Sequence, residues 1–337
     1  MIRNTESLLE KIRVLHAEIR DGLIEACEHS SLDRLAKVIA EEAGDRIFAI
    51  DRISEEILLD RFSNIAQEWP CLLIAEGLGN TGKAVLPAGC SPEIVFVVDP
   101  IDGTRGLMYQ KRPGWILTGV APYRGEKTIL ADIEIAVQTE IPLNKQYLCD
   151  SLWAVSGQGT CGERANRITG EKSVLHTRPS RAKTIAEGFG GISRFFPGAR
   201  SLFAAVDDEL VHRILGSPPN SKAAPLAYED QYISTAGQLY ELMMGHDRWV
   251  ADLRSVANPW LKKRGKPSAM CCHPYDLCTE MIAREAGVII VNPSGGPLRE
   301  NLDTESDCSW VGFANAEIRD QVLPVLQDLL KEHLGDF

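Results

Sequence analysis

Two aspartates that follow a short apolar run are the feature that most constrains this chain. Residues 94–98 read Ile-Val-Phe-Val-Val, which predicts a buried strand, and the hexapeptide Asp99-Pro100-Ile101-Asp102-Gly103-Thr104 comes directly after it. The strand end fixes the loop and Pro100 stiffens it, so both carboxylates and the Ile101 carbonyl between them are available as hard oxygen ligands. Such a set suits Mg²⁺ rather than zinc. The pattern therefore predicts a strand that ends in a magnesium-binding loop.

The same hexapeptide carries two further groups with chemical use. Gly103 lets a phosphate approach the backbone, and the Thr104 hydroxyl can hold an attacking water. Because Asp, Pro and Gly are all turn formers, a solvated turn is the alternative interpretation. Two carboxylates, a glycine and a hydroxyl within one short segment at a strand's C-terminal end favour the chemical interpretation.

The order of apolar patterns along the chain predicts helices layered on sheets rather than a single doubly wound sheet. The expected helices are residues 5–27, 31–43, 53–65, 237–244, 276–286 and 316–334, and the expected strands are 71–75, 94–98, 115–120, 129–137, 152–155, 249–250 and 288–291. A break in the pattern near residues 170–183 predicts two domains, 1–175 and 176–337. The first would be an α+β metal-binding half, and the second an α/β half that completes the site.

Composition narrows the range of partners. The formal net charge of −11 repels nucleic acid polymers and anionic membranes. A small phosphorylated metabolite remains a suitable partner if metal ions or local basic residues reverse the field at one site. The nine cysteines include no C-x-x-C pair, and the charged N-terminus lacks the apolar core of a signal peptide. We therefore expect a cytoplasmic protein that binds no membrane, and a homodimer is left open.

Three further segments extend the pattern. Tyr275-Asp276 is followed by Glu285-Ala286-Gly287, Asp51 stands at the start of an expected helix, and Ser234-Thr235-Ala236-Gly237 opens another. Taken singly, each has a structural explanation: Asp276 and Asp51 could cap helices, and small residues at 234–237 could serve close packing. Together with the hexapeptide they make the chain resemble the inositol monophosphatase superfamily, over about residues 31 to 315.

This resemblance implies a layered α-β-α-β-α sandwich of the inositol monophosphatase and fructose-1,6-bisphosphatase type, and Mg²⁺-dependent hydrolysis of a phosphate monoester by water. It implies two or three Mg²⁺ ions with the ligand set Glu76, Asp99, the Ile101 carbonyl, Asp102 and Asp276. The catalytic group would be Thr104, Asp51 and Glu76, and the phosphate would lie against Gly103, Thr104, Arg105 and Thr235. The resemblance further implies inhibition by Li⁺.

The sequence departs from the family pattern at places that concern the metal and the substrate. The family has a Glu-Glu pair where this chain has Glu76-Gly77, so the site has either Glu76 as the ligand or one carboxylate fewer. Inositol-specific members have a Glu where this chain has Ala269. Arg105 and the segment Lys262-Lys263-Arg264-Gly265-Lys266 could hold a second phosphate, although a solvated basic loop explains the lysines slightly better.

The substrate is accordingly left between an inositol phosphate-like monoester and a sugar or nucleotide bisphosphate. A different class of function is a non-catalytic or weakly active ligand-binding relative with the same fold, for which Gly77 is the supporting feature. One further motif is discounted. Residues 157–162 match G-x-G-x-x-G, but no second strand with an acidic end follows, so we expect a glycine-rich hairpin rather than a dinucleotide site.

Overall fold

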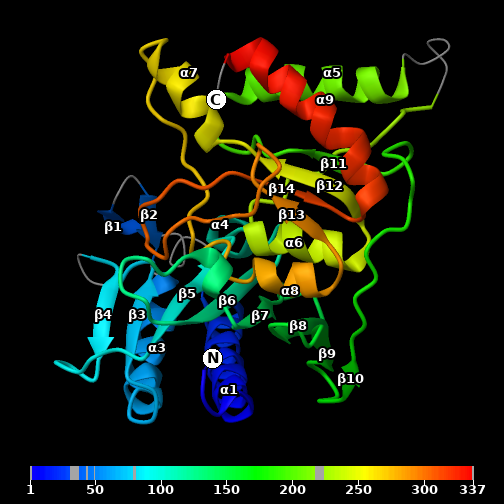
Figure 1. Cartoon of the computed structure of the whole chain (residues 1–337). Helices are drawn as coiled ribbons and strands as arrows, with labels where there is room; N and C mark the ends of the chain where they lie inside the picture. Colours follow the sequence, from blue (N-terminus) through cyan, green and yellow to red (C-terminus); the bar gives the residue numbers. More distant parts are fainter. Residues whose placement is uncertain are drawn as a thin grey trace.

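The computed structural model describes residues 2–30, 38–42, 45–48, 50–78, 81–216 and 224–335, with the backbone alone at 38–42, 45–48 and 51–57. Figure 1 shows helices and sheets in alternating layers. An eight-stranded sheet and a four-stranded sheet enclose a helical layer, and each sheet is covered on its other face by two helices. The expected layered α-β-α-β-α architecture is confirmed.

The lower helical layer consists of α1 (Thr5–His29) and α3 (Asp51–Ile65), which pack on the large sheet. The apolar residues of α1 recur every three or four positions and are buried, namely Leu8, Ile12, Leu15, Ile19 and Leu23. A face of this kind gains stability only when it packs against another apolar surface, which the sheet supplies. The two helices expected from this periodicity at 5–27 and 53–65 are confirmed.

The large sheet has the strand order β10-β9-β8-β7-β6-β5-β3-β4. Its strands are β3 (Cys71–Ala75), β4 (Lys83–Leu86), β5 (Ile94–Asp102), β6 (Gly114–Pro122), β7 (Ile135–Ile141), β8 (Leu148–Val155), β9 (Thr160–Asn166) and β10 (Lys172–Val174). Only the pairing of β3 with β5 is parallel among these described neighbours, with Ala75 beside Val98. Because parallel strands end at the same edge, the residues that follow β3 lie near the hexapeptide at the end of β5.

The central helical layer is formed by α6 (Thr235–Met244) and α8 (Glu280–Glu285). Above it lies the four-stranded sheet, in the order β11-β12-β14-β13. Its strands are β11 (Phe189–Ile192), β12 (Asp247–Asp252), β13 (Ile289–Val291) and β14 (Trp310–Phe313), and the outer layer is α5 (Arg200–Leu215) with α9 (Ala316–Leu334). The short elements α4 (Thr104–Met108), α7 (Asn258–Lys262), η1 (Leu130–Asp132) and η2 (Ser255–Ala257) lie in connections.

Several sequence-based boundaries are corrected. The helix expected at 31–43 is wrong where it can be compared, because Val38–Glu42 form β1, which pairs antiparallel with β2 (Asp45–Phe48); residues 31–37 and 43–44 lie outside the described part. The helix expected at 276–286 begins only at Glu280, since residues 274–279 form turns. The strand expected at 129–137 opens with η1, because the Asp132 carboxylate accepts the Ile129 N–H and closes a turn before β7.

The glycine-rich segment 157–162 connects β8 to β9 as a hairpin, as expected. The N–H groups of Gly157 and Gly159 both donate to the Glu285 carboxylate, at 2.7 and 2.8 Å. The turn therefore binds an anionic side chain of the protein itself.

The division at residue 175 stays a prediction. The strands of the large sheet end at Val174 and those of the small sheet begin at Phe189, yet one buried apolar cluster contains both Val97 of β5 and Leu239 of α6. Among the described residues, no helix combines the length and the apolar sequence that a membrane-spanning helix requires.

Candidate metal centre

An irregularity at the end of β5 places both aspartates of the hexapeptide on one side. Asp99 pairs with Leu117 of β6 and Asp102 with Trp115, so three steps along β5 oppose two steps along β6. In a regular strand, residues three apart point to opposite faces of the sheet. The extra residue reverses this alternation. The two carboxylates, which are 2% and 6% exposed as residues, consequently point into the same buried space.

Hydrogen bonds within the hexapeptide hold its shape. The Ile101 N–H donates to Asp99 Oδ1 at 3.0 Å, and the Thr104 hydroxyl donates to the Ile101 carbonyl at 2.8 Å. The Ile101 carbonyl, expected as a metal ligand, thus carries one hydrogen bond and keeps a second lone pair. Thr104 is the first residue of α4, so its hydroxyl lies where the hexapeptide loop meets that helix.

Gly103 lies directly opposite the segment that opens α6. Its φ of 86° lies in the left-handed region that favours glycine. A Cβ at this position would lie 3.0 Å from Cβ of Ser234 and 3.2 Å from the Ile233 carbonyl oxygen. Glycine is therefore required both by the backbone conformation and by the start of α6 directly opposite.

The Asp102 carboxylate, at the end of β5, caps the N-terminus of α6. Its Oδ2 accepts hydrogen bonds from the Ser234 hydroxyl at 2.8 Å and from the Ala236 N–H at 2.6 Å. The N-terminus of a helix favours negative charge, so α6 stabilises the ionised form of this carboxylate. Thr235, expected to contact phosphate, is the first residue of α6, and its hydroxyl lies 3.7 Å from Cys272 Sγ. The structure thus places Thr235 beside Asp102.

Asp276 reaches the same space from the second half of the chain. Ligand oxygens of Asp99, Asp102 and Asp276 all lie within 4.8 Å of one another. Asp276 Oδ2 accepts the His273 N–H at 2.6 Å, which fixes the turn ahead of α8. Asp276 therefore does not cap α8, and its other oxygen is available to a ligand.

Glu76 lies next to this group, at the end of β3. Its charge contributes to raising the pKa of Asp99, and its Oε1 lies 3.5 Å from the Tyr275 hydroxyl. Gly77 has a φ of 73°, so a glutamate there would require a strained left-handed backbone. Gly77, where the sequence departs from the family pattern, and Tyr275 thus both adjoin Glu76.

The electrostatics of the centre are those of crowded acids. Burial raises the pKa of Asp99 well above its usual value, and the charges of Glu76, Asp102 and Asp276 raise it further. Burial, followed by the charge of Asp102, raises the pKa of Asp276 to about 8. Burial raises the pKa of Asp102 to about 6, opposed by the hydrogen bonds from α6. Like charges this close disfavour joint ionisation, and a bound cation would relieve them.

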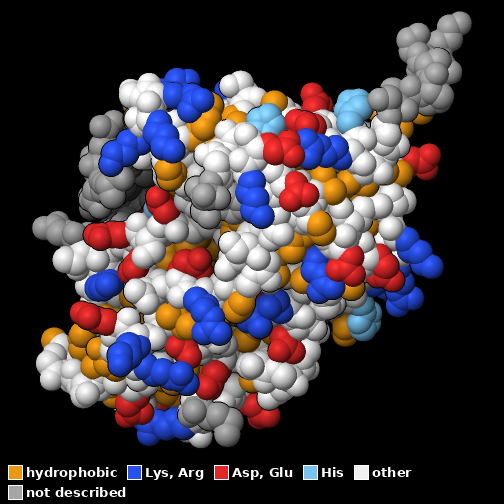
Figure 2. Space-filling model, turned by 45° about the horizontal axis from the view of Figure 1, so that its top comes forward, with side chains coloured by type: hydrophobic (Ala, Val, Ile, Leu, Met, Phe, Trp, Pro, Cys, Tyr) orange, Lys and Arg blue, Asp and Glu red, His pale blue; other side chains and the backbone are white. Residues whose placement is uncertain are grey.

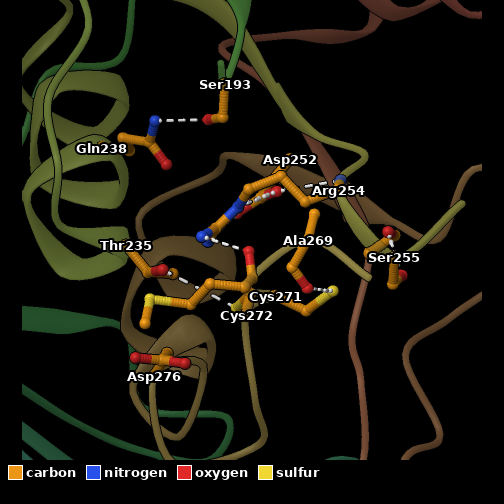
Figure 3. Close-up of polar contacts among 12 residues, drawn as sticks. Ser193, Thr235, Gln238, Asp252, Arg254, Ser255, Ala269, Cys271, Cys272 and Asp276 are labelled. Carbon is orange, nitrogen blue, oxygen red and sulfur yellow. Dashed lines mark hydrogen bonds and ion pairs between the residues drawn. The ribbon is translucent and has the colours of Figure 1, made fainter. Parts of the chain in front are cut away.

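A buried ion pair missing from the sequence-based expectations lies beside the acids. Arg254 Nε and Nη2 donate to the Asp252 carboxylate, with Nη2 at 2.6 Å from Oδ2, and Arg254 Nη1 donates to the Met270 carbonyl at 2.9 Å. Figure 3 shows this guanidinium directed toward the segment that carries Cys272 and Asp276. Its charge acts to lower the pKa of Asp276. Asp252 ends a buried strand, as Asp102 ends β5, and this common pattern could have identified it.

The remaining predicted residues are placed as follows. The Arg105 guanidinium lies 5.2 Å from the ring of Phe196, a residue of the second half. Asp51 opens α3, but its side chain lies outside the described part of the structure, so its role stays a prediction. In the basic segment that follows α7, Arg264 and Lys266 lie 3.8 and 5.9 Å from the ring of Trp260.

No family model matches the chain, and no curated protein matches it. Among solved structures, the chain is similar to the IMPase of Thermotoga maritima, with 16% identity, a TM-score of 0.60, and coverage of 98% of this chain and 99% of that one. It is also similar to fructose-1,6-bisphosphatase of Leishmania major in holo form, with 14% identity, a TM-score of 0.68, and coverage of 98% and 95%. The extragenic suppressor protein suhB of Bartonella henselae is similar at 14% identity, with a TM-score of 0.62 and coverage of 95% and 98%.

The chain has the fold that these structures share, over nearly its whole length. The likeness in fold agrees with the resemblance seen in the hexapeptide and around Asp276. At such low identity it establishes the fold, and the activity has to be argued from the site.

Proposed function

We propose that the protein hydrolyses a small phosphate monoester with the help of bound Mg²⁺. The observation that carries this proposal is the convergence of Asp99, Asp102 and Asp276, whose ligand oxygens lie within 4.8 Å of one another. They come from opposite halves of the chain, and burying three acids together is costly unless a cation compensates them. The solved structures with the same fold include a fructose-1,6-bisphosphatase, which supports phosphate ester hydrolysis as the reaction class.

The residues present fit magnesium. Every candidate ligand is a carboxylate or carbonyl oxygen, the donor type that Mg²⁺ prefers. We assign Asp99, Asp102, Asp276 and the Ile101 carbonyl as ligands, with Glu76 beside them as a further ligand. When bound, Mg²⁺ would neutralise phosphate charge and lower the pKa of a water, and two or three ions are proposed by analogy with the family.

The side chains around the acids would position the reactants. The Thr104 oxygen can accept a hydrogen bond from the attacking water, and Thr104 is itself held by its bond to the Ile101 carbonyl. Gly103 is proposed to contact the phosphate, as the resemblance implies, and Thr235 lies where α6 meets Asp102. Asp51 is proposed to assist Thr104, as the family resemblance implies.

The substrate is proposed to be an inositol phosphate-like monoester or a sugar or nucleotide bisphosphate. Arg105 beside Phe196 is the candidate for contact with a second phosphate. Figure 2 shows acidic and basic side chains interspersed over the face that it presents, which suits a small ligand better than a long polyanion. We further propose sensitivity to Li⁺ and a cytoplasmic location.

A second candidate function is ligand binding without efficient turnover. Gly77 favours this function, because a glycine in a left-handed conformation stands where the family has a carboxylate. Dependence of turnover on the metal ligands separates the two functions.

The test measures phosphate release from a panel of monoesters and bisphosphates, with Mg²⁺ and with EDTA. Asp99→Asn should abolish Mg²⁺-dependent release while leaving the fold intact, because it removes a ligand and also some repulsion. Asp60→Asn, an exposed change on α3 with the same change of charge, is the matched control. Wild-type rates in Asp99→Asn would refute the assignment. Saturable binding of a panel member without release would favour the second function.

A further inference from the structure

A cavity separate from the carboxylate centre lies beside the loop between β7 and β8. Its volume is about 460 Å³, within the range of small-molecule sites. Strands β7, β8 and β9 contribute charged side chains, α6 contributes Tyr240, and the loop contributes Leu143 and Tyr147. Figure 1 shows the strand ends and α6 that surround this region.

Two of the charged groups in the cavity neutralise each other. Asp150 and Arg164 face each other on β8 and β9 and form a two-point ion pair, with both N–O distances at 2.7 Å. The Tyr240 hydroxyl also donates to Asp150 Oδ2, at 2.6 Å. The charge of Asp150 is therefore compensated within the protein.

Glu140 is different. It is 6% exposed, and its carboxylate accepts hydrogen bonds from the Gln146 side chain at 2.7 Å and from the Asp150 N–H at 2.9 Å. Both donors are neutral, and within the described part of the chain no cationic side chain lies within ion-pair distance of Glu140. Burial raises the pKa of Glu140 to about 7. Each carboxylate oxygen can accept one more hydrogen bond.

A carboxylate in this setting is costly to the fold. Its two oxygens accept from separate donors, the Gln146 amide and the Asp150 N–H, so a glutamine at position 140 would keep only one of these bonds but would avoid the buried charge. The structure therefore places on the wall of a cavity a carboxylate that no described cationic side chain contacts directly, and the charge of Arg164 acts on it without forming an ion pair. The apolar surfaces beside it, from Leu143 and the rings of Tyr147 and Tyr240, suit a ligand with an organic body.

We propose that this cavity binds a small, singly charged organic ammonium ion. Its N–H groups would donate to Glu140, and its apolar body would lie against Tyr147 and Tyr240, whose rings also attract a cation. A lone carboxylate with neutral partners is a poor site for a divalent metal, which needs several oxygen ligands. Exposed Lys145 at the rim disfavours multiply charged amines. The site shares no residue with the proposed metal centre, so it does not depend on the proposed activity.

The experiment is calorimetric titration of the full chain with 2-phenylethylamine, and with 2-phenylethanol as a neutral ligand of matched shape. We expect one saturable site for the amine with a Kd of about 1 mM or below, and much weaker binding of the alcohol. Glu140→Gln should weaken amine binding roughly tenfold or more. Glu171→Gln, an exposed change of the same charge on the β9–β10 turn, should leave it unaltered.

Tyr147→Ala provides a second variant, because Tyr147 is 54% exposed and its loss should not unfold the chain. It should weaken amine binding several-fold if its ring lines the occupied site. The proposal is overturned if the wild-type protein shows no saturable amine binding up to about 10 mM. Equal affinities for amine and alcohol, or equal affinities in wild type and Glu140→Gln, would overturn it as well. If Glu140→Gln does not fold, an unchanged affinity in Tyr147→Ala has the same consequence.

Discussion

Replacement of Arg254 by methionine should destabilise the protein strongly, and Asp252 is the reason. The side chains of the pair are 8% and 0% exposed, and the guanidinium makes the ion-pair contacts to Asp252 as well as a bond to the Met270 carbonyl. Arg254→Met would leave the Asp252 carboxylate buried without its cation. Breaking a buried pair from one side in this way costs about 3–5 kcal/mol of unfolding free energy.

The double variant separates the pair from its surroundings. In Arg254→Met combined with Asp252→Asn, neither charge remains to be desolvated, so the total loss should be smaller than the sum of the single losses. We expect a coupling energy of about 2–3 kcal/mol. The exposed pair Arg213 and Glu209 on α5 is the matched control, with 35% and 40% side-chain exposure, and its coupling should stay below about 0.5 kcal/mol.

The assay is equilibrium unfolding in urea at pH 7 with EDTA, followed by circular dichroism and by tryptophan fluorescence. EDTA keeps metal binding out of the comparison, and coincident transitions from both probes are required for a single free energy. If Arg254→Met alone costs less than about 1 kcal/mol, Asp252 is not left uncompensated and the reasoning fails. The reasoning also fails if the coupling energy of Arg254 and Asp252 is no larger than that of the exposed pair Arg213 and Glu209.

Three further outcomes are expected. Glu76→Gln should raise the Mg²⁺ concentration for half-maximal rate by roughly tenfold and lower kcat, and an unchanged titration would remove Glu76 from the ligands. Gly103→Ala should cost about 1–3 kcal/mol in urea unfolding, through its left-handed φ and the contact with Ser234, whereas Gly170→Ala, also left-handed but with open space around its Cβ, should cost less. Folding raises the pKa of Asp276 to about 8. Without metal, the stability that Asp276 contributes is therefore fully present at a pH below the pKa of the unfolded chain, and it is lost as the pH rises toward 8. Mg²⁺ should therefore raise Tm more at pH 8 than at pH 6, and equal shifts would contradict the shared site.

Much of the fold followed from local patterns in the sequence. The burial of α1 and the strands β3 and β5 rest on apolar periodicity, which the core enforces directly. By contrast, the sequence predicts helix where the structure has β1. The strand is stabilised by its pairing with β2, and the periodicity of a single segment carries no information about a pairing between two segments. The same holds for the late start of α8, where a side-chain bond to the His273 N–H replaces a helical turn.

The candidate site divides in a similar way. The hexapeptide and Asp276 were recognisable from residue type and spacing, and the structure brings their carboxylates together. Arg254 was not recognisable in this way. An arginine two residues after the last aspartate of a strand occurs in buried and in solvated ion pairs alike, so the spacing does not distinguish them. Its environment is created by packing, with the rings of Phe195 and Phe196 at 4.7 and 5.4 Å.

The irregularity in β5 and the start of α6 act together on Asp102. The extra residue turns Asp102 to the side of Asp99, and the same carboxylate then accepts hydrogen bonds from Ser234 and Ala236. Because α6 favours its charge, its pKa of about 6 lies below that of Asp276, at about 8. Since α6 and β5 are far apart in the sequence, the hydrogen bonds that favour the ionised form of Asp102 exist only when α6 is packed against the end of β5.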